Sequence, residues 1–152
     1  MKTIIQRVSS ADVTVDGDVV GRIDSGFMIL FGAGQGDTEE EADYIARKTA
    51  RMRIFSDENG KMNLSLKDIG GGALVISQFT LYADCRHGNR PGFTNAESPE
   101  RAEQLYDYFC ERLGEEAGIV VEKGIFGADM KVSLVNDGPV TILLEKEHEV
   151  DK

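Results

Sequence analysis

Two short polar segments contain the residues best suited to chemistry. The first is "SQFT" at residues 77–80, directly after the apolar run "GGALVI", and the second is "NDGP" at residues 136–139, between two apolar runs. The first offers hydroxyl and amide groups that could position a substrate, or attack it if a base activated Thr80. The second is unusual for a turn, because a Gly-Pro pair fixes one backbone angle and removes an amide donor. We therefore expect Gly138 and Pro139 to do more than reverse the chain.

Side chains that serve as general bases or metal ligands are scarce. The sequence has two histidines, His87 in a polar loop and His148 near the acidic end, and its two cysteines, Cys85 and Cys110, form no Cys-x-x-Cys pair. Neither a zinc site nor a disulfide framework is indicated. His87 could act as a base for Thr80, although a histidine in a polar loop is more simply a surface residue. We expect no metal and no cofactor, so the substrate or the backbone must supply part of any catalysis.

A glycine-rich segment, "GAGQGD" at residues 32–37, follows an apolar run and precedes a helical pattern. That order is typical of loops that bind dinucleotides or phosphate. Its glycine spacing differs from G-x-G-x-x-G, no Gly-Lys-Ser/Thr follows, and three glutamates at residues 39–41 would repel a phosphate at the start of the helix. We interpret the segment as a plain glycine-rich turn.

Composition excludes several classes of protein. The 152 residues fit one domain, and 17 Lys and Arg against 27 Asp and Glu give a net charge of −10, which argues against generic nucleic-acid binding. We therefore expect no DNA partner. No apolar run approaches the ~20 residues of a membrane span, and residues 1–10 lack the pattern of a secretory signal. A cytoplasmic protein without membrane contact is expected.

Apolar patterns predict the strands around these segments. Residues 4–23 alternate around Asp16-Gly17, which is typical of a hairpin, and "RIFSDENGKMNLSL" indicates another hairpin at Asn59-Gly60. The continuous run "GFMILFGA" at residues 26–33 predicts a strand covered on both faces. Further strands are expected around "GGALVISQFTL", "IVVEKG", "MKVSLV" and "VTILLE".

Two segments have the spacing of amphipathic helices. In "DTEEEADYIARKTARM", Thr38 and Glu41 predict a capping box; a later helix should begin at Ser98-Pro99 and end within residues 114–118. Together the elements predict an α+β fold: one domain over residues 1–146, with mostly antiparallel sheets and two main helices packed on one side, in a layered β-β-α arrangement. Residues 147–152 are expected to form an acidic, flexible tail.

Both polar segments resemble the signatures of the D-aminoacyl-tRNA deacylase (D-tyrosyl-tRNA deacylase) family, Ser-Gln-Phe-Thr and Asn-x-Gly-Pro-x-Thr. Each is complete here and they occur in the usual order. The resemblance extends over "IQRVSSADVTVDG", "RIFSDENGKMNLSL", "RPGFTNAESPERAEQLYDYF" and "FGADMKVSLVNDGPVT", and so over nearly the whole chain up to the tail. It implies a hydrolase that cleaves the ester bond of D-aminoacyl-tRNA, binds the acylated 3′ end and serves in proofreading.

The resemblance also implies how the enzyme rejects L substrates. Family members are homodimers in which a Gly-cisPro element of one subunit reaches into the active site of the other and clamps the amino group of the substrate. Here that element is Gly138-Pro139. An L side chain would collide with the clamp and a D side chain would not, so selection works by exclusion and accepts many D residues. Glycine has no side chain to exclude, and we expect glycyl-tRNA, including glycine mischarged on tRNA-Ala, to be cleaved.

Roles for the first motif follow from the same resemblance. Backbone amides of Phe79 and Thr80 are the candidates that stabilise the developing negative charge, and the terminal ribose 2′-hydroxyl assists attack. Thr80 could instead be the nucleophile. Gln78 is expected to contact substrate or steady the site, and Ser77 could simply cap local backbone groups.

Other candidate substrate-binding residues lie outside that motif. Asn136 and Thr141 complete the second signature, and Arg7 corresponds to the residue that anchors the incoming Gly-Pro element, although it could be an ordinary exposed strand residue. Met130 matches a position that lines the pocket for the terminal adenosine, although Met is also a common core residue. Basic residues near the site, Arg86, Arg90 and Lys67, would let an acidic protein bind the 3′ end of tRNA.

Two alternatives remain open. The first is a non-catalytic acidic dimer that binds nucleic acid or nucleotide, because a fold alone does not secure activity. The second is a related editing enzyme whose Gly-Pro bond is trans and whose substrate is an L-aminoacyl-tRNA. The complete Ser-Gln-Phe-Thr and Asn-x-Gly-Pro-x-Thr motifs favour the D-specific deacylase.

Overall fold

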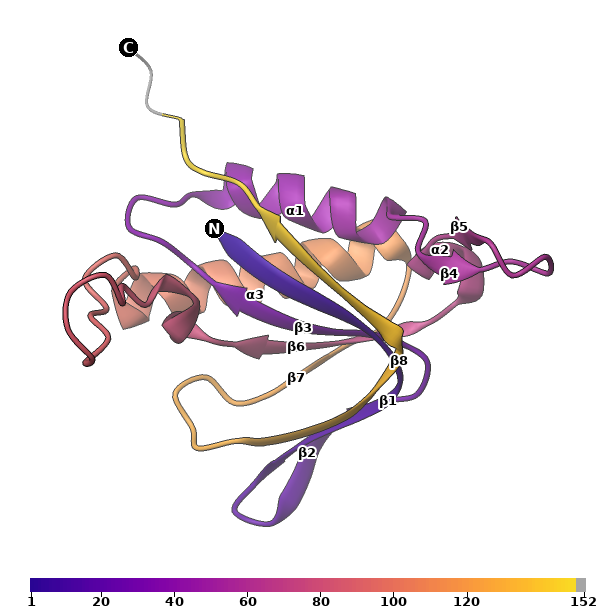
Figure 1. Cartoon of the computed structure of the whole chain (residues 1–152), viewed down its shortest axis with the longest axis horizontal. Coiled ribbons are helices and arrows are strands. Elements are labelled where there is room, and N and C mark those ends of the chain that lie inside the picture. The colour runs from indigo at the N-terminus through magenta and orange to yellow at the C-terminus, as the bar shows by residue number, and fades with distance from the viewer. Residues whose placement is uncertain (150–152) are drawn as a thin grey trace.

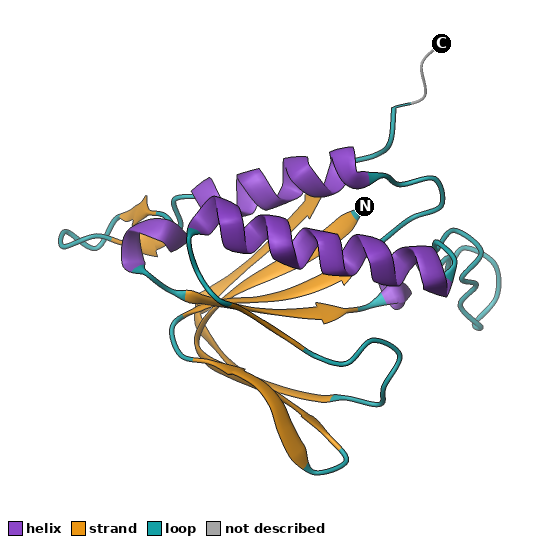
Figure 2. Ribbon diagram, turned by 180° about the vertical axis from the view of Figure 1, so that it is seen from behind, coloured by secondary structure: helices purple, strands orange, loops and turns teal. Residues whose placement is uncertain are grey.

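The computed structural model describes residues 1–149 and consists of one curved sheet with two long helices on one face (Figures 1 and 2). The strands of the main sheet are β1 (Lys2–Val15), β2 (Asp18–Ile23), β3 (Gly26–Gly32), β6 (Gly72–Ser77), β7 (Val121–Lys123) and β8 (Lys131–Glu145), and β4 (Phe55–Ser56) pairs with β5 (Met62–Leu64) in a separate hairpin. The helices are α1 (Glu39–Arg51), the short α2 (Leu66–Ile69) and α3 (Pro99–Ala117), with a 3₁₀ turn, η1 (Phe79–Tyr82).

The sheet has the order β2-β1-β3-β6-β7, and β8 pairs with β1. β1 is antiparallel to β2, β3 and β8, whereas β6 is parallel to both β3 and β7. Parallel neighbours need a crossover, and α1 and α3 provide the two crossovers on the same face of the sheet. The predicted α+β fold with two helices on one side is confirmed, and most but not all of its pairings are antiparallel. The two ends of the sheet approach each other, because a Cβ added at Gly21 of β2 would lie 2.8 Å from the Lys123 carbonyl of β7.

Local signals in the sequence formed the expected structures. Asp16 and Gly17 both have positive φ in the β1–β2 turn, as a two-residue hairpin turn requires. Thr38 and Glu41 form the predicted capping box of α1. α3 begins at Pro99 as expected, but the Ser98 side chain makes no capping hydrogen bond. The Ser98 backbone amide donates to Oε1 of Glu97.

The core lies mainly between the helices and the sheet. Its largest cluster contains aromatic and aliphatic side chains from both layers, including Phe27, Phe31, Ile45, Leu105 and Phe109. A smaller cluster covers the other face of the sheet and includes Val13, Met28, Leu74 and Ile76. β3 is therefore buried on both faces, as its continuous apolar run predicts.

β8 is one long strand, not the two strands expected on either side of residues 136–139. Pairing with β1 continues through the Gly-Pro segment because the register shifts there. Between the pair Val8–Asn136 and the pair Gln6–Thr141, β8 advances five residues while β1 advances two. Residues 137–140 of β8 therefore lie opposite the single residue Arg7 of β1, and we call these four residues the β8 bulge.

The chain after β8 runs beside the start of α1. Lys146 exchanges two backbone hydrogen bonds with Met1, and His148 Nδ1 lies 2.6 Å from Oε1 of Glu41, a buried carboxylate. Burial opposes ionisation of Glu41, but hydrogen bonds from Thr38 and His148 prevail and lower its pKa to about 2. The predicted flexible tail, residues 147–152, lies partly outside the described residues, since 150–152 are not described.

Candidate active site

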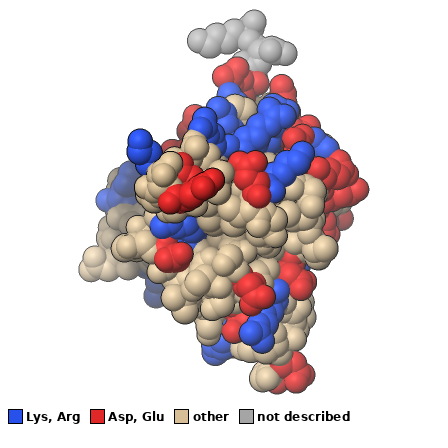
Figure 3. Space-filling view, turned by 90° about the vertical axis from the view of Figure 1, so that its right-hand side faces the viewer, with Lys and Arg blue, Asp and Glu red and all other residues tan. Residues whose placement is uncertain are grey.

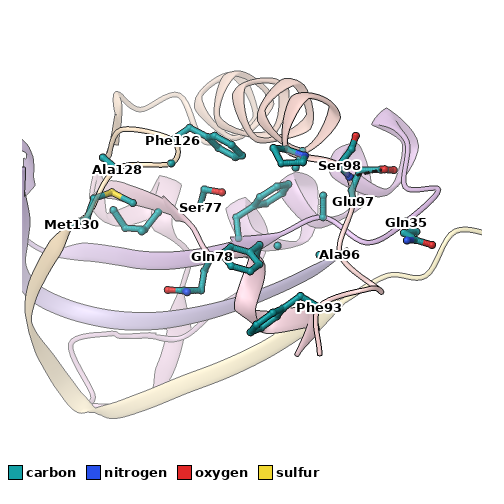
Figure 4. Close-up of a pocket in the computed structure, with 18 of the residues that line it drawn as sticks. Gln35, Ser77, Gln78, Phe93, Ala96, Glu97, Ser98, Phe126, Ala128 and Met130 are labelled. Carbon is teal, nitrogen blue, oxygen red and sulfur yellow. Dashed lines mark hydrogen bonds between the residues drawn. The ribbon is translucent and has the colours of Figure 1, made fainter. Parts of the chain in front are cut away.

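A cavity of about 970 Å³ opens at the carboxyl ends of β3 and β6. Its wall is formed by η1, the start of α3 and the segment between β7 and β8 (Figure 4). Figure 4 places Phe126, Ala128 and Met130 along one side, with Glu97 and Ser98 at the other. Among the described residues that line it, Glu97 is the only ionisable side chain. Such a site suits a mostly apolar ligand better than a highly charged one.

The "SQFT" segment forms the turn at the mouth of this cavity. Ser77 ends β6, and the Gln78 amide donates to the Phe31 carbonyl at 2.7 Å, which ties the turn to β3. Phe79 and Thr80 then begin η1 and are both exposed. Their two backbone amides donate to no described residue. They are therefore available to bind an oxygen atom of a ligand.

The Thr80 hydroxyl has an amide partner and no base. Gln78 Nε2 donates to Thr80 Oγ1 at 2.5 Å. His87, the one histidine close in sequence, makes no hydrogen bond to Thr80, and Glu97 uses its oxygens to accept from the backbone amides of Gly36 and Ser98. Within the described part of the chain, no group is placed to remove the Thr80 proton. This arrangement favours a positioning role for Thr80 over nucleophilic attack.

The second motif forms a different cluster around the β8 bulge. Asn136 Oδ1 accepts from the Val140 amide at 2.8 Å, and Asn136 Nδ2 donates to Thr141 Oγ1 at 3.1 Å, so the bulge is closed at its base. Gly138 and Pro139 are exposed at its tip, and the peptide bond between them is cis, as the family resemblance implies.

Arg7 connects this bulge to the body of the protein. Its Nε donates to the Asp137 carbonyl at 2.8 Å, and its Nη1 donates to the Ile54 carbonyl just before β4 at 2.6 Å. A Cβ added at Gly138 would lie 3.1 Å from Arg7 Nη2. The guanidinium therefore packs directly beneath the tip, and Arg7 is not an ordinary exposed strand residue.

The two clusters lie at opposite ends of the sheet within one chain. Arg7 pairs with Phe27 of β3, whereas Ser77 pairs with Phe31. Four residues of an extended strand correspond to about 13 Å. None of the described residues that line the cavity belongs to the β8 bulge. Of the candidate site residues, Ser77, Gln78, Phe79 and Met130 thus line the cavity, Thr80 adjoins it, and the rest gather at the bulge.

Some cavity residues were not predicted from the sequence. Phe93 packs edge-to-face on Phe79 with ring centroids 5.0 Å apart, Phe126 contacts the buried ring of Tyr106, and Glu97 anchors the start of α3. Phe93 and Phe126 both lie in segments that carry the family resemblance. The sequence signal that could have pointed to them is an aromatic residue beside a glycine in a loop, as in "PGF" and "IFG".

The three basic residues expected near the site do not all gather there. Lys67 lies on α2, at the opposite end of the molecule from the loop that follows η1 (Figure 1). Arg86 pairs with Asp84 at 2.8 Å, and this contact lowers the pKa of Asp84 to about 2. Figure 3 shows the face at the α2 end, away from the loop that follows η1, and there basic and acidic side chains are intermingled around an uncharged centre. That face offers no broad positive surface.

Within residues 1–149, no group of three or more His, Cys, Asp or Glu side chains is arranged to hold a metal ion. None of the described helices is long and apolar enough to cross a bilayer.

Comparisons with known proteins agree with the motifs. Residues 4–145 match the family model described as D-Tyr-tRNA(Tyr) deacylase. A D-aminoacyl-tRNA deacylase of Thermosipho melanesiensis is 52% identical over 147 residues, covering 97% of this chain and 98% of the relative.

Two solved structures have the same fold. One, titled c-Myc DNA Unwinding Element Binding Protein, is 40% identical with a TM-score of 0.89 and covers 97% of this chain and 100% of its own. Another, titled as a probable eukaryotic D-amino acid tRNA deacylase, is 17% identical with a TM-score of 0.83, covering 95% of this chain and 98% of its own. The family-model match and the sequence identity to its relatives show that the chain belongs to the D-aminoacyl-tRNA deacylases, which are hydrolases of the aminoacyl-tRNA ester bond.

Proposed function

We propose that this protein hydrolyses the ester bond of D-aminoacyl-tRNA and leaves L-aminoacyl-tRNA intact. The observation that carries the proposal is the exposed turn at Phe79 and Thr80, whose amides have no described acceptor and lie at the mouth of an apolar cavity. Family membership supplies the substrate class, and the cavity suits the terminal nucleoside of a tRNA. An enzyme that contacts only the 3′ end shared by all tRNAs can act on many of them.

In the proposed reaction, water attacks the ester carbonyl carbon, and the bond between that carbon and the ribose 3′-oxygen breaks. Negative charge that develops on the carbonyl oxygen is stabilised by the amides of Phe79 and Thr80. The attacking water loses a proton and the leaving ribose oxygen gains one. Because the cavity offers no side-chain base, the neighbouring ribose 2′-hydroxyl is the group that assists this transfer. Gln78 Nε2 donates to the Thr80 hydroxyl and so holds that side chain in place.

Selection between D and L substrates is proposed to come from a second subunit. The β8 bulge and the cavity lie too far apart in one chain to act on one substrate, but the bulge of a partner could enter the cavity. Val135 and Leu143, on either side of the bulge, are 57% and 60% exposed, which favours burial of this surface in a homodimer. Main-chain atoms of Gly138 and Pro139 would then exclude an L side chain.

Exclusion of this kind also predicts which further substrates are accepted. Glycine carries a hydrogen atom where the L side chain would be, so glycyl-tRNA, including glycine mischarged on tRNA-Ala, is proposed as a substrate. Asn136, Thr141 and Arg7 contribute by holding the bulge, and Met130 by lining the subsite for the terminal adenosine. We place this activity in the cytoplasm, where aminoacyl-tRNAs are made and used.

DNA binding is a second candidate, because one structural neighbour at 40% identity is titled as a DNA-binding protein. The net charge of −10 opposes it, since duplex binding relies on contacts to many phosphates. An L-specific editing activity differs only in which ester is cleaved. The D-specific deacylase explains the exposed amides and the bulge together.

The decisive experiment compares hydrolysis of D-tyrosyl-tRNA and L-tyrosyl-tRNA by the purified protein, with a Pro139→Ala variant alongside. Cleavage of the D ester alone, with loss of discrimination in the variant, is expected. Cleavage of the L ester by the wild-type protein would identify an L-specific editing enzyme. Cleavage of neither ester, together with binding to duplex DNA, would favour the nucleic-acid-binding alternative.

A further inference from the structure

Phe93 is the aromatic side chain that contacts the turn at Phe79 and Thr80 from outside the family motif. It lies in the loop between η1 and α3 and is 38% exposed, while Phe79 is 55% exposed. The two rings meet edge-to-face, with an interplanar angle of 69° and centroids 5.0 Å apart. Both line the cavity. An exposed aromatic pair at a cavity mouth calls for a reason beyond core packing.

The turn itself has few anchors of its own. None of the residues of η1 is buried, and Gln78 provides no side-chain cap to the backbone of the turn. Its backbone is tied to the sheet by the single bond from the Gln78 amide to Phe31. Leu81 and Tyr82 pack against Gly32 and Gly34 and hold the far end of the turn, whereas the Phe79 and Thr80 amides lie at its start. At that start, the ring of Phe79 packs on Phe93.

Phe93, in contrast, is attached to a well-fixed segment. The Ala96 amide donates to the Phe93 carbonyl at 3.2 Å, and the Gln35 amide donates to the Asn95 carbonyl at 3.0 Å. Glu97 extends this attachment, because its amide donates to the Ala33 carbonyl at 3.0 Å. The residues around Phe93 are thus bound to the β3–α1 turn, independently of η1.

The loop is also closed directly before Phe93. Asp84 and Gly92 exchange two backbone hydrogen bonds of 2.7 and 2.9 Å, so residues 85–91 form a separate exposed loop. Asp84 is itself held by Arg86 through Nε and Nη2. Movement of the outer loop is therefore not transmitted freely to Phe93, whose ring provides a fixed surface.

We propose that Phe93 is a positioning residue that fixes the Phe79–Thr80 turn through the ring of Phe79. The inference rests on the proposed function, in which the Phe79 and Thr80 amides stabilise the developing oxyanion. These donors contribute most when charge appears on the ester oxygen, so a loosened turn slows the chemical step more than it weakens substrate binding. Phe93 acts on the rate constant kcat and only slightly on KM.

Three substitutions at Phe93 separate this role from simple packing. Phe93→Ala removes the ring, Phe93→Leu keeps apolar volume without an aromatic edge, and Phe93→Tyr keeps the ring. Met62→Ala on β5 is the matched control, since Met62 is 58% exposed and lies outside the cavity. Each variant is assayed for kcat and KM on D-tyrosyl-tRNA, and for its melting temperature.

Phe93→Ala is expected to lower kcat by roughly tenfold, because a small misplacement of catalytic groups has effects of this order or larger. KM should change by less than about threefold and the melting temperature by no more than about 4 °C. Phe93→Tyr should keep the wild-type kcat, and the kcat of Phe93→Leu should lie between those of Phe93→Ala and Phe93→Tyr. Met62→Ala should match the wild type.

A double-mutant cycle with Phe79→Ala tests whether Phe93 acts through that ring. Once the ring of Phe79 is absent, further loss of Phe93 should leave kcat unchanged within about twofold. Additive losses, an unchanged kcat in Phe93→Ala, or an effect on KM alone would each overturn the proposal while leaving the deacylase activity intact. A wild-type protein that cleaves no D ester would instead overturn the proposed function, and this inference with it.

Discussion

Arg7→Ala removes the side chain that connects the β8 bulge to the rest of the sheet. The guanidinium donates to two carbonyls, at 2.8 Å to Asp137 and at 2.6 Å to Ile54, and the second bond is partly buried. A hydrogen bond from a charged donor contributes about 1.5 to 3 kcal/mol, and the exposed bond contributes less because water competes for it. We expect the free energy of unfolding to fall by about 2 to 3 kcal/mol and the melting temperature by about 5 to 10 °C.

Activity should fall by more than this loss of stability explains. Without Arg7, only Asn136 and the flanking strand pairs hold the bulge, so Gly138 and Pro139 would sample several positions. At a temperature well below the melting transition, kcat/KM for D-tyrosyl-tRNA is expected to drop by roughly 10- to 100-fold. Hydrolysis of the L ester should rise relative to the D ester, and both rates are measured by release of the labelled amino acid.

Two companion variants make the result interpretable. Arg7→Lys keeps the positive charge but cannot reach both carbonyls with one ammonium, so an intermediate loss is expected. Arg22→Ala removes an exposed arginine of β2 and should change the unfolding free energy by less than about 0.5 kcal/mol. If Arg7→Ala were destabilised as expected yet kept its D-ester activity and its rejection of the L ester, the assignment of Arg7 to the selector would be refuted.

Three other predictions follow from the same geometry. Thr80→Ala should keep at least about a tenth of the wild-type single-turnover rate, because the partner of its hydroxyl is the Gln78 amide and not a base. A rate loss of about 10³-fold or more would identify Thr80 as the nucleophile. Glycyl-tRNA should be hydrolysed in a parallel assay, and its resistance would show that exclusion of a side chain is not the whole basis of selection. His148→Ala should lower the melting temperature below pH 6.5 and have no effect at pH 9. The reason is that the hydrogen bond to Glu41 raises the pKa of His148 in the folded state, and this stabilisation is lost as pH rises through that value; equal differences at both pH values would contradict it.

Local features of the fold could be predicted because the responsible residues are neighbours in sequence. The Asp16-Gly17 turn, the Thr38–Glu41 capping box and the covering of β3 on both faces each depend on spacing within a few residues. The continuity of β8 could not be predicted in this way. It depends on β1, more than a hundred residues away, which accepts a register shift opposite the Gly-Pro segment.

The site shows the same division between local and distant information. The motif residues could be named in advance, but their separation into two clusters follows from the register of the strands, which depends on contacts between residues far apart in the sequence. Phe93 and Glu97 reach the cavity because Gln35 and Ala33 hold their loop from a distant turn. Lys67 was expected near the site on charge alone, and it lies elsewhere because charge carries no information about distance.

The proposed selection by main-chain atoms gives a reason for the several contacts that hold the bulge. A side-chain pocket recognises what it contacts, whereas a carbonyl and a proline ring at a fixed position reject whatever enters their volume. Rejection therefore works only if the tip cannot move aside. Arg7 supports the tip from below, Asn136 closes its base, and β1 pairs with β8 on both sides of it. The exposed tip of one chain thus has the rigidity that a selector acting in a partner's cavity requires.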